Sequence, residues 1–234
     1  RSSVMQNPHI PYAAVCGGVN IDIGAHSFAP LRAKDSNPGK VELSLGGVGR
    51  NIAHNLRLLG VQVELLTALG GDSRAAQVEE SCAALGIGLS HALRVPDGRT
   101  STYVFVGGSD GDMAVAVADM EICERLTPEY FAAQLPLLNA ASAVVLDTNL
   151  PRASLAYLAE YCTAPLFADP VSTAKAEKLR GLLGHIHTLK PNRIEAELLS
   201  GVQITDDKSL RQAAQALLAQ GLSRVFISLG GDGV

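Results

Sequence analysis

The stretch ASAVVLDTNLPRASLAYLAEYCTAPLFAD, residues 141–169, decides the fold of this chain. It opens with an apolar run that ends at Asp147, continues with a helical pattern over residues 151–162, and closes with a second apolar run that ends at Asp169. Two strands joined by a helical crossover lie parallel in one sheet, because the helix carries the chain back to its starting edge. The stretch therefore predicts a βαβ unit and an α/β fold.

The same alternation of strand and helix patterns extends on both sides of this unit. The expected elements are a strand in YAAVCGGVNID (12–22) that leads into a polar turn, a helix over 51–59, a strand over 61–69, a helix from Asp72 to Gly86, a helix near 128–140, a helix near Lys175, a strand over 185–189, a helix from Asn192, a helix over 206–220 and a strand over 224–229. Repeated units of this kind predict a mainly parallel central sheet with helices on both faces, in three α/β/α layers.

Two segments do not fit that rhythm. STYVFVGG and MAVAVA, separated by SDGD, predict a β-hairpin within residues 97–119, and the segment around residues 41–45 alternates like a strand. We expect both to form a small β sheet that stands off the main domain as a lid, with lid segments at about 23–45 and 97–119 inserted in a single domain spanning 1–234. Such a sheet could also serve as the contact of a homodimer.

Composition limits the classes of partner. The chain has 234 residues, 47% hydrophobic content and a formal net charge of −4, and it contains no basic run interleaved with aromatic residues. This composition predicts a packed core and disfavours binding of a nucleic-acid polymer. No apolar run reaches the roughly 20 residues that a membrane helix needs. The four cysteines are far apart without CxxC spacing, so the expectation is a cytoplasmic protein with reduced thiols and no zinc site.

Polar residues follow the ends of several predicted strands. Open parallel sheets bind ligands beyond the carboxyl ends of their strands, so these residues should gather at one edge. They are Asn20, Asp22, Asp147, Asn149, Asp169, Lys190, Asn192 and the run from Ser228 to Gly233. Each of these residues also has an ordinary explanation as a turn residue or helix cap. For Asn192 we weigh a helix cap equally with a ligand contact, and for Asp72, at the start of another predicted helix, we expect a cap. The convergence at one edge predicts a ligand site.

A glycine-rich turn precedes one of the predicted helices, in DSNPGKVELSLGGVGRN, residues 35–51. Without a Cβ atom, Gly46, Gly47 and Gly49 let main-chain N–H groups approach a ligand closely. The helix that follows adds unpaired amides and the positive end of its dipole. The turn thus predicts a site for a polyhydroxylated or anionic small molecule, with a plain connection as the alternative.

Four motifs together resemble the ribokinase-like (PfkB) family of sugar and nucleoside kinases. They are GGVNID at 17–22, LGGVGRNIAHNLRLLG at 45–60, LKPNRIEAELLSG at 189–201 and ISLGGDGV at 227–234. The resemblance implies a ribokinase-like fold and phosphoryl transfer from ATP with Mg²⁺. It leaves open whether a monovalent cation is also used. The runs DSNPGK, GGVGRNIA, ADPVS and IHTLKPNRIEAE are most similar to the members that phosphorylate the 5′ hydroxyl of pseudouridine.

The resemblance also implies roles for individual residues at the sugar. Asp22 would accept hydrogen bonds from the ribose 2′ and 3′ hydroxyls, because a carboxylate is an acceptor that can take two donors. Gly46 and Gly47 would let the main chain lie against the sugar, and Asn51 would contribute an amide. Asn20 and Asn149 complete the expected substrate set, although ribokinase has a glutamate at the position of Asn149. Residues 100–102 on the predicted hairpin could reach the uracil of the nucleoside.

A second set is implied for the nucleotide. Asn192 and Glu195 match the NxxE motif, in which Glu195 would hold magnesium through water. Asp169 and Lys190 would lie near the same edge. Ser228, Gly230 and Gly233 match a turn that approaches the phosphates or ribose of ATP.

The family's catalytic aspartate belongs to a GxGD motif that does not occur before Val234. GGDG at 230–233 belongs to the SLGGDGV motif, one secondary-structure element before the place of GxGD, so the catalytic residue is unknown. We expect the catalytic base and much of the adenine pocket beyond Val234, in a longer protein. Three functions stay open: a pseudouridine kinase or another PfkB nucleoside or sugar kinase, a nucleoside-binding homologue without phosphoryl transfer, and a structural role for the lid sheet in dimerisation.

Overall fold

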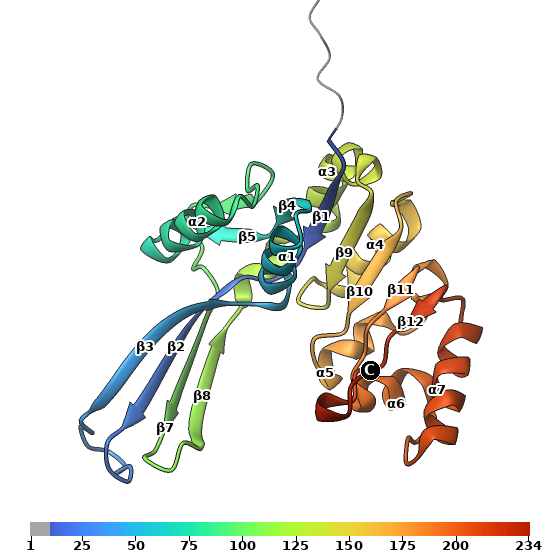
Figure 1. The fold of residues 1–234 in the computed structure, drawn as a ribbon. Coiled ribbons are helices and arrows are strands. Elements are labelled where there is room, and N and C mark those ends of the chain that lie inside the picture. Colours follow the sequence, from blue (N-terminus) through green and yellow to red (C-terminus); the bar gives the residue numbers. More distant parts are fainter. Residues whose placement is uncertain (1–9) are drawn as a thin grey trace, which may run out of the picture.

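The structure, a computed structural model, describes residues 10–234 and contains a six-stranded central sheet. Its order is β12-β11-β10-β9-β1-β4, and every neighbouring pair is parallel (Figure 1). The strands are β1 (Tyr12–Cys16), β4 (Gln62–Leu66), β9 (Ala143–Asp147), β10 (Leu166–Asp169), β11 (Thr188–Leu189) and β12 (Arg224–Val225). β9 and β10 pair with Asp147 opposite Asp169, which confirms the βαβ unit predicted from residues 141–169.

Helices cover both faces of this sheet. They are α1 (Val48–Leu58), α2 (Ser73–Leu85), α3 (Pro128–Ala140), α4 (Arg152–Tyr161), α5 (Thr173–Ala176), α6 (Arg193–Ser200) and α7 (Asp207–Ala219), with short 3₁₀ turns η1 (Glu121–Arg125), η2 (Glu177–Leu179), η3 (Leu183–His185) and η4 (Gly230–Asp232). Successive strand side chains point to opposite faces, so Ala14 packs in a core with α3, α4 and α7, whereas Val15 packs in a core with α1 and α2. The predicted three-layer α/β/α architecture is confirmed.

A second, four-stranded sheet extends away from the main body, at the lower left of Figure 1. Its order is β3-β2-β7-β8, where β2 and β7 are parallel and the two outer pairs are antiparallel. The strands are β2 (Asn20–Ser27), β3 (Gly39–Gly46), β7 (Thr102–Gly107) and β8 (Met113–Asp119). We call this the lid sheet. A pair of short parallel strands, β5 (Ala68–Gly70) and β6 (Leu93–Val95), lies beside α2.

Some element boundaries differ from those expected from sequence. The polar turn predicted after the first strand is wrong, because the chain passes through Gly17 and Gly18 and starts β2 at Asn20. Asn20 and Asp22 therefore lie on a lid strand, in a run where Ile21 alternates with them and is buried. The strand expected over 61–69 is split into β4 and β5, and only the first two residues of the run 224–229 form β12.

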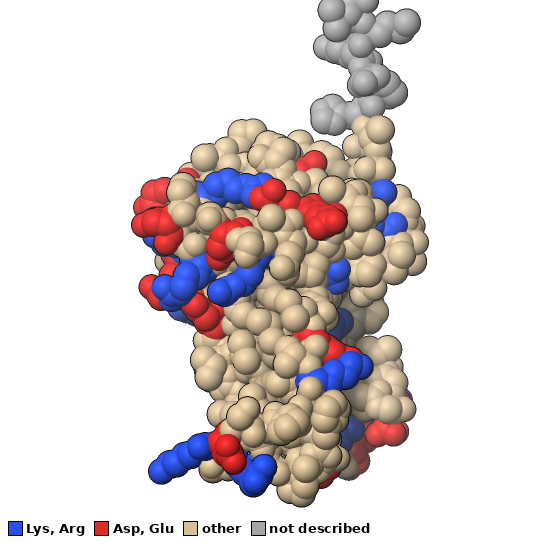
Figure 2. Space-filling view, turned by 90° about the vertical axis from the view of Figure 1, so that its left-hand side faces the viewer, with Lys and Arg blue, Asp and Glu red and all other residues tan. Residues whose placement is uncertain are grey.

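The described part of the chain contains no helix that is long and apolar enough to cross a membrane. On the face shown in Figure 2, Lys and Arg side chains lie among Asp and Glu side chains. That face therefore lacks the continuous basic surface with which proteins bind nucleic-acid polymers.

Candidate functional site

Asn20, Asp22 and Gly46 form one cluster at the base of the lid sheet. Gly46, the last residue of β3, pairs with Asn20 on β2, and Asn20 Nδ2 donates to Asp22 Oδ1. A Cβ atom at position 46 would lie 2.3 Å from Asp22 Oδ2, so only glycine leaves the carboxylate where it is. Partial burial raises the pKa of Asp22, and the hydrogen bond from Asn20 acts in the opposite direction. The cluster offers a half-buried carboxylate beside bare main chain.

Gly47 lies where β3 enters α1 and crosses the connection between β1 and β2. Its φ of 98° is in the region that favours glycine, and a Cβ atom there would lie 2.5 Å from the main-chain oxygen of Gly18. Asn51 is exposed in the first turns of α1, and its main-chain N–H donates to Gly47 O at 2.9 Å. The predicted sugar residues of this motif are thus held beside the β1–β2 connection.

Three amides at the start of α1 donate to acceptors within the protein. Gly49 N donates to Asp147 Oδ2 at 2.8 Å, and Arg50 N donates to Gly18 O at 3.1 Å. The amide of Asn51 is also bonded, to Gly47. These three amides are therefore already engaged within the protein, and the expected site for a polyhydroxylated or anionic molecule at this turn stays a prediction. A neutral, polyhydroxylated ligand remains compatible with the turn.

Asp147, one of the polar residues expected at this edge, was assigned no role at the sugar or the nucleotide, and it is fully buried. Its Oδ2 accepts from Gly18 N at 2.9 Å and from Gly49 N, and its Oδ1 accepts from Asn149 N at 2.9 Å. Burial raises the pKa of Asp147, whereas the main-chain donors lower it. The position of Asp147 at a strand end was visible in the sequence, but its distant partners were not.

Asn149 is buried against the β1–β2 connection, and its side chain faces Gly18. Its Oδ1 accepts from Lys175 Nζ at 2.5 Å, at the start of α5. Lys178 Nζ donates to the main-chain oxygens of Thr148 and Leu150, at 2.8 and 3.1 Å. Sequence reasoning missed Lys175; the only available signal was that a lysine follows β10 closely, near the edge where the other polar residues gather.

The predicted nucleotide residues gather further along the same edge. Asn192 caps α6: Glu195 N donates to Asn192 Oδ1 at 2.8 Å, and Asn192 N donates to Glu195 Oε1 at 2.9 Å. The NxxE motif is therefore a capping box, and the cap interpretation of Asn192 is confirmed. Lys190 Nζ lies 3.6 Å from Asp169 Oδ2, with the lysine exposed and the aspartate mostly buried. Asp169 Oδ1 also accepts from Val171 N at 2.8 Å.

Ser228, Gly230 and Gly233 lie on the exposed turn that follows β12. Ser228 N donates to Pro191 O at 2.9 Å, and Ser228 forms a parallel bridge with Asn192, which brings this turn to the capping box. Gly230 and Gly233 have φ values of 61° and 94°. No atom lies within 4 Å of the position of a Cβ at either glycine, so the main chain faces open space.

Residues 100–102, which the sequence suggested for the base, are buried. Thr100 Oγ1 donates to Asp72 Oδ1 at 2.6 Å, and Thr100 N donates to Asp72 Oδ2 at 2.8 Å. Asp72 also accepts from Ala75 N at 3.0 Å, which confirms it as the cap of α2. The Thr100 side chain is therefore used to fasten the lid base to α2 and not to contact a ligand.

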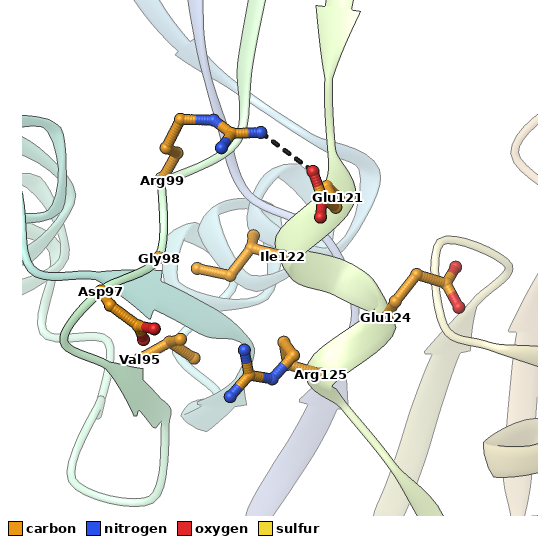
Figure 3. A pocket seen from close by; sticks show the side chains of 8 residues that line it. All are labelled: Val95, Asp97, Gly98, Arg99, Glu121, Ile122, Glu124 and Arg125. Atoms are coloured by element: carbon orange, nitrogen blue, oxygen red, sulfur yellow. Dashed lines mark hydrogen bonds and ion pairs between the residues drawn. The ribbon is translucent and has the colours of Figure 1, made fainter.

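A pocket of about 260 Å³ lies at the base of the lid hairpin, between η1 and the segment that follows β6 (Figure 3). Arg99 in its wall donates to Glu121 and to Asp119, and Glu124 points away from the other labelled side chains. None of the residues predicted to bind sugar or nucleotide lines it. We therefore separate this pocket from the candidate site.

Comparison with known proteins gives the family. Residues 11–234 match the family model described as "pfkB family carbohydrate kinase". The chain is 40% identical to pseudouridine kinase of Escherichia coli (strain K12), covering 95% of this chain and 72% of that protein. It is 37% identical to an uncharacterized sugar kinase, YeiI, of the same strain, covering 95% of this chain and 62% of that protein.

Solved structures agree with this result. A carbohydrate kinase from Agrobacterium tumefaciens superimposes with a TM-score of 0.83 at 32% identity, covering 93% of this chain and 70% of that one. Ribokinase of Arabidopsis thaliana complexed with ribose and ATP shares the fold, with a TM-score of 0.82 at 21% identity, over 95% of this chain and 73% of that one. The three-layer fold with its lid sheet is ribokinase-like, and the chain belongs to the pfkB family of carbohydrate kinases.

Proposed function

We propose that the protein phosphorylates the 5′ hydroxyl of pseudouridine with ATP. The observation that carries this proposal is the cluster of Asp22, Asn20 and Gly46, which presents a carboxylate beside main chain that is free of a Cβ. The identity of 40% to a pseudouridine kinase over 95% of the chain favours pseudouridine among the possible acceptors.

In this proposal the sugar is held between the lid base and α1. Asp22 accepts hydrogen bonds from the 2′ and 3′ hydroxyls, and charge-assisted bonds of this kind are about twice as strong as neutral ones. Gly46 leaves room for the Asp22 carboxylate and Gly47 lets the chain turn closely past Gly18, so that their main chain can lie beside the ribose. The Asn51 amide supplies a further donor and acceptor. Asn20 and Asn149 orient the acceptor groups, since each is bonded to a charged neighbour, Asp22 and Lys175 respectively.

The ATP phosphates are assigned to the edge formed by the α6 capping box and the turn after β12. Lys190, which is exposed beside Asp169, supplies a positive charge, and the open main chain at Gly230 and Gly233 can approach a phosphate. Ser228 brings that turn to Asn192.

Mg²⁺ fits this edge as an ion held mainly by phosphate and water. Among residues 10–234, no group of three or more His, Cys, Asp or Glu side chains could hold a metal ion by itself. Mg²⁺ commonly keeps several waters and binds through substrate phosphates with one or two carboxylates. Glu195, whose Oε1 is used in the capping box, would act through water, and the ion would neutralise charge on the phosphates.

A panel of acceptors, assayed with the full-length protein, tests the proposed substrate. With ATP and Mg²⁺, we expect phosphorylation of pseudouridine ahead of uridine, inosine, guanosine, ribose and fructose 6-phosphate. Inosine and guanosine belong in the panel because the chain is also 28% identical to a guanosine-inosine kinase of Exiguobacterium acetylicum. Equal or faster turnover of ribose or a purine nucleoside would show that pseudouridine is not the preferred acceptor.

A nucleoside-binding protein without phosphoryl transfer is the second candidate. The sugar cluster lies within the described residues, whereas no catalytic base is assigned among them. Calorimetry with pseudouridine and a coupled assay for ADP, both on the full-length protein, separate the two. Binding without ADP production would favour the second candidate.

We also propose that the lid sheet contacts a second copy of the chain. The register places eight apolar residues on one face of the lid sheet: Ile23, Ala25, Val41, Leu43, Val104, Val106, Val115 and Val117. Val41, Leu43 and Val117 are 61%, 58% and 67% exposed, whereas Asp22 lies on the opposite face. A continuous apolar face of this kind marks an interaction surface.

Sedimentation velocity tests this contact. Val117→Lys and Leu43→Lys should convert a dimer to monomers, whereas Ala153→Lys on the exposed side of α4 should leave the dimer intact. A wild-type protein that is monomeric at all concentrations would refute the contact.

A further inference from the structure

Asp147 is a fully buried carboxylate that is used by neither the sugar nor the nucleotide contacts proposed above. In the described part of the chain it takes part in no ion pair, and the main-chain N–H groups of Gly18, Gly49 and Asn149 donate to it at 2.8 to 2.9 Å. The side chain of Asn149 also contributes to lowering its pKa. A buried carboxylate that lacks such partners would be very costly. The three donors therefore explain how the charge is tolerated.

These donors belong to segments that are far apart in the sequence. Gly18 lies between β1 and β2, Gly49 lies in the first turn of α1 after β3, and Asn149 follows β9. β2 carries Asp22, and α1 carries Asn51. One carboxylate at the end of β9 thus fastens both connections through which the chain enters and leaves the first lid hairpin.

The glycines around the carboxylate are explained by the same contact. A Cβ atom at Gly17 would lie 2.3 Å from Asp147 Oδ2. A Cβ atom at Gly49 would lie 3.1 Å from the same oxygen and 2.9 Å from the Cα of Gly17. Gly17 and Gly49 therefore make room for Asp147, whereas Gly46 makes room for Asp22. The glycine-rich motif serves two carboxylates, one inside the protein and one at the ligand.

We propose that Asp147 is a positioning residue for nucleoside binding: it acts as an internal anion that holds the β1–β2 connection and the start of α1 at a fixed spacing. This inference rests on the proposed sugar site and adds a residue to it. Asp22 on β2 and Asn51 on α1 can meet one ribose only if that spacing is kept. Asp169 lies on the neighbouring strand β10, but the phosphate contacts assigned to α6 and to the turn after β12 lie beyond β10 and receive no hydrogen bond from Asp147, so ATP affinity should depend much less on this spacing.

Asp147→Asn provides the test, because it keeps the shape of the side chain. The amide oxygen can still accept from Gly18 and Gly49, but the amide NH₂ would face the N–H of Asn149, and the negative charge is lost. We expect the dissociation constant for pseudouridine, measured by calorimetry, to rise by about 10-fold or more, since bonds to charged groups exceed neutral ones. The dissociation constant for a non-hydrolysable ATP analogue should change by less than about 2-fold.

Ser154→Ala is the matched control for a general loss of stability. Ser154 is fully buried, and its hydroxyl donates to Leu126 O at 2.5 Å, on α4 and away from the sugar cluster. This variant should lower the melting temperature and leave both affinities unchanged. If Asp147→Asn behaves in the same way, or weakens both ligands equally, Asp147 is a structural residue only and the proposal is overturned.

Gly49→Ala is a second variant that keeps the carboxylate, for the case in which Asp147→Asn does not fold. The added methyl group should push the Gly49 amide away from Asp147 and weaken pseudouridine selectively. Hydrogen exchange of the Gly18 and Gly49 amides in the unliganded protein is independent of the substrate assignment. Faster exchange at these two amides in Asp147→Asn supports the proposal even if the acceptor is another nucleoside, and unchanged exchange refutes it.

Discussion

The Asp22 carboxylate occupies the space that a side chain at Gly46 would fill, since a Cβ atom there would lie 2.3 Å from Asp22 Oδ2. Gly46→Ala should therefore displace the carboxylate without a change in charge. We expect kcat/KM for the nucleoside to fall by about 10-fold or more, because one or both charge-assisted bonds to the ribose would be misaligned. Steady-state kinetics measure this effect. Normal kinetics in Gly46→Ala would show that Asp22 does not contact the sugar from this position.

Removing the carboxylate itself gives a larger effect. Asp22→Ala should lower kcat/KM by about two orders of magnitude or more, because two hydrogen bonds to a charged acceptor contribute about 1.5 to 3 kcal/mol each. Its recorded hydrogen-bond partner in the protein is Asn20, so the melting temperature should change little. Glu160→Ala, which removes an exposed carboxylate near the end of α4, is the control and should be kinetically silent. Unaltered kinetics in Asp22→Ala would mean that the carboxylate only shapes the lid base.

The pH dependence of nucleoside binding should report Asp22. Burial raises the pKa of this carboxyl above 3.8, and only the ionised form accepts from both ribose hydroxyls. Affinity should therefore be full at neutral pH and fall as the pH drops through the raised pKa, earlier than for an ordinary aspartate. The same shift works against the ionised form in the folded state, so protonation of Asp22 alone should not unfold the protein. Calorimetry in a pH series should show this acidic limb in wild type and lose it in Asp22→Asn.

The central sheet could be predicted from sequence because its signals are local. The strand and helix patterns of residues 141–169 are contained in one continuous stretch, and β9, α4 and β10 follow them. The lid sheet could be predicted because residues 97–119 break that alternation. A polar turn is expected at Asn20 and Asp22 because polar residues follow the first apolar run, whereas the chain continues through Gly17 and Gly18 into β2.

The role of Asp147 could not be predicted in this way. Its partners Gly18 and Gly49 are 129 and 98 positions away in the sequence, and they meet it only after β1 and β9 have paired. The contact of Lys175 with Asn149 joins positions 26 apart and depends on where α5 begins. Patterns along the chain identify strand ends, whereas contacts between strand ends depend on the sheet order.

Asn192 offers a test that separates a helix cap from a nucleotide contact. Asn192→Ala should remove the capping box of α6 and cost about 1 kcal/mol of unfolding free energy, which thermal unfolding measures. Asn192→Asp keeps an acceptor for the Glu195 N–H and should restore that stability, while it adds a negative charge beside the proposed ATP phosphates. If Asn192 lies near the phosphates, ATP affinity should fall further in Asn192→Asp than in Asn192→Ala, even though the aspartate variant is the more stable of the two.

Asp206→Ala, which removes the equivalent cap of α7, is the control that should lower stability without an effect on ATP affinity. Recovery of ATP affinity together with stability in Asn192→Asp would show instead that Asn192 acts on the site only by capping α6.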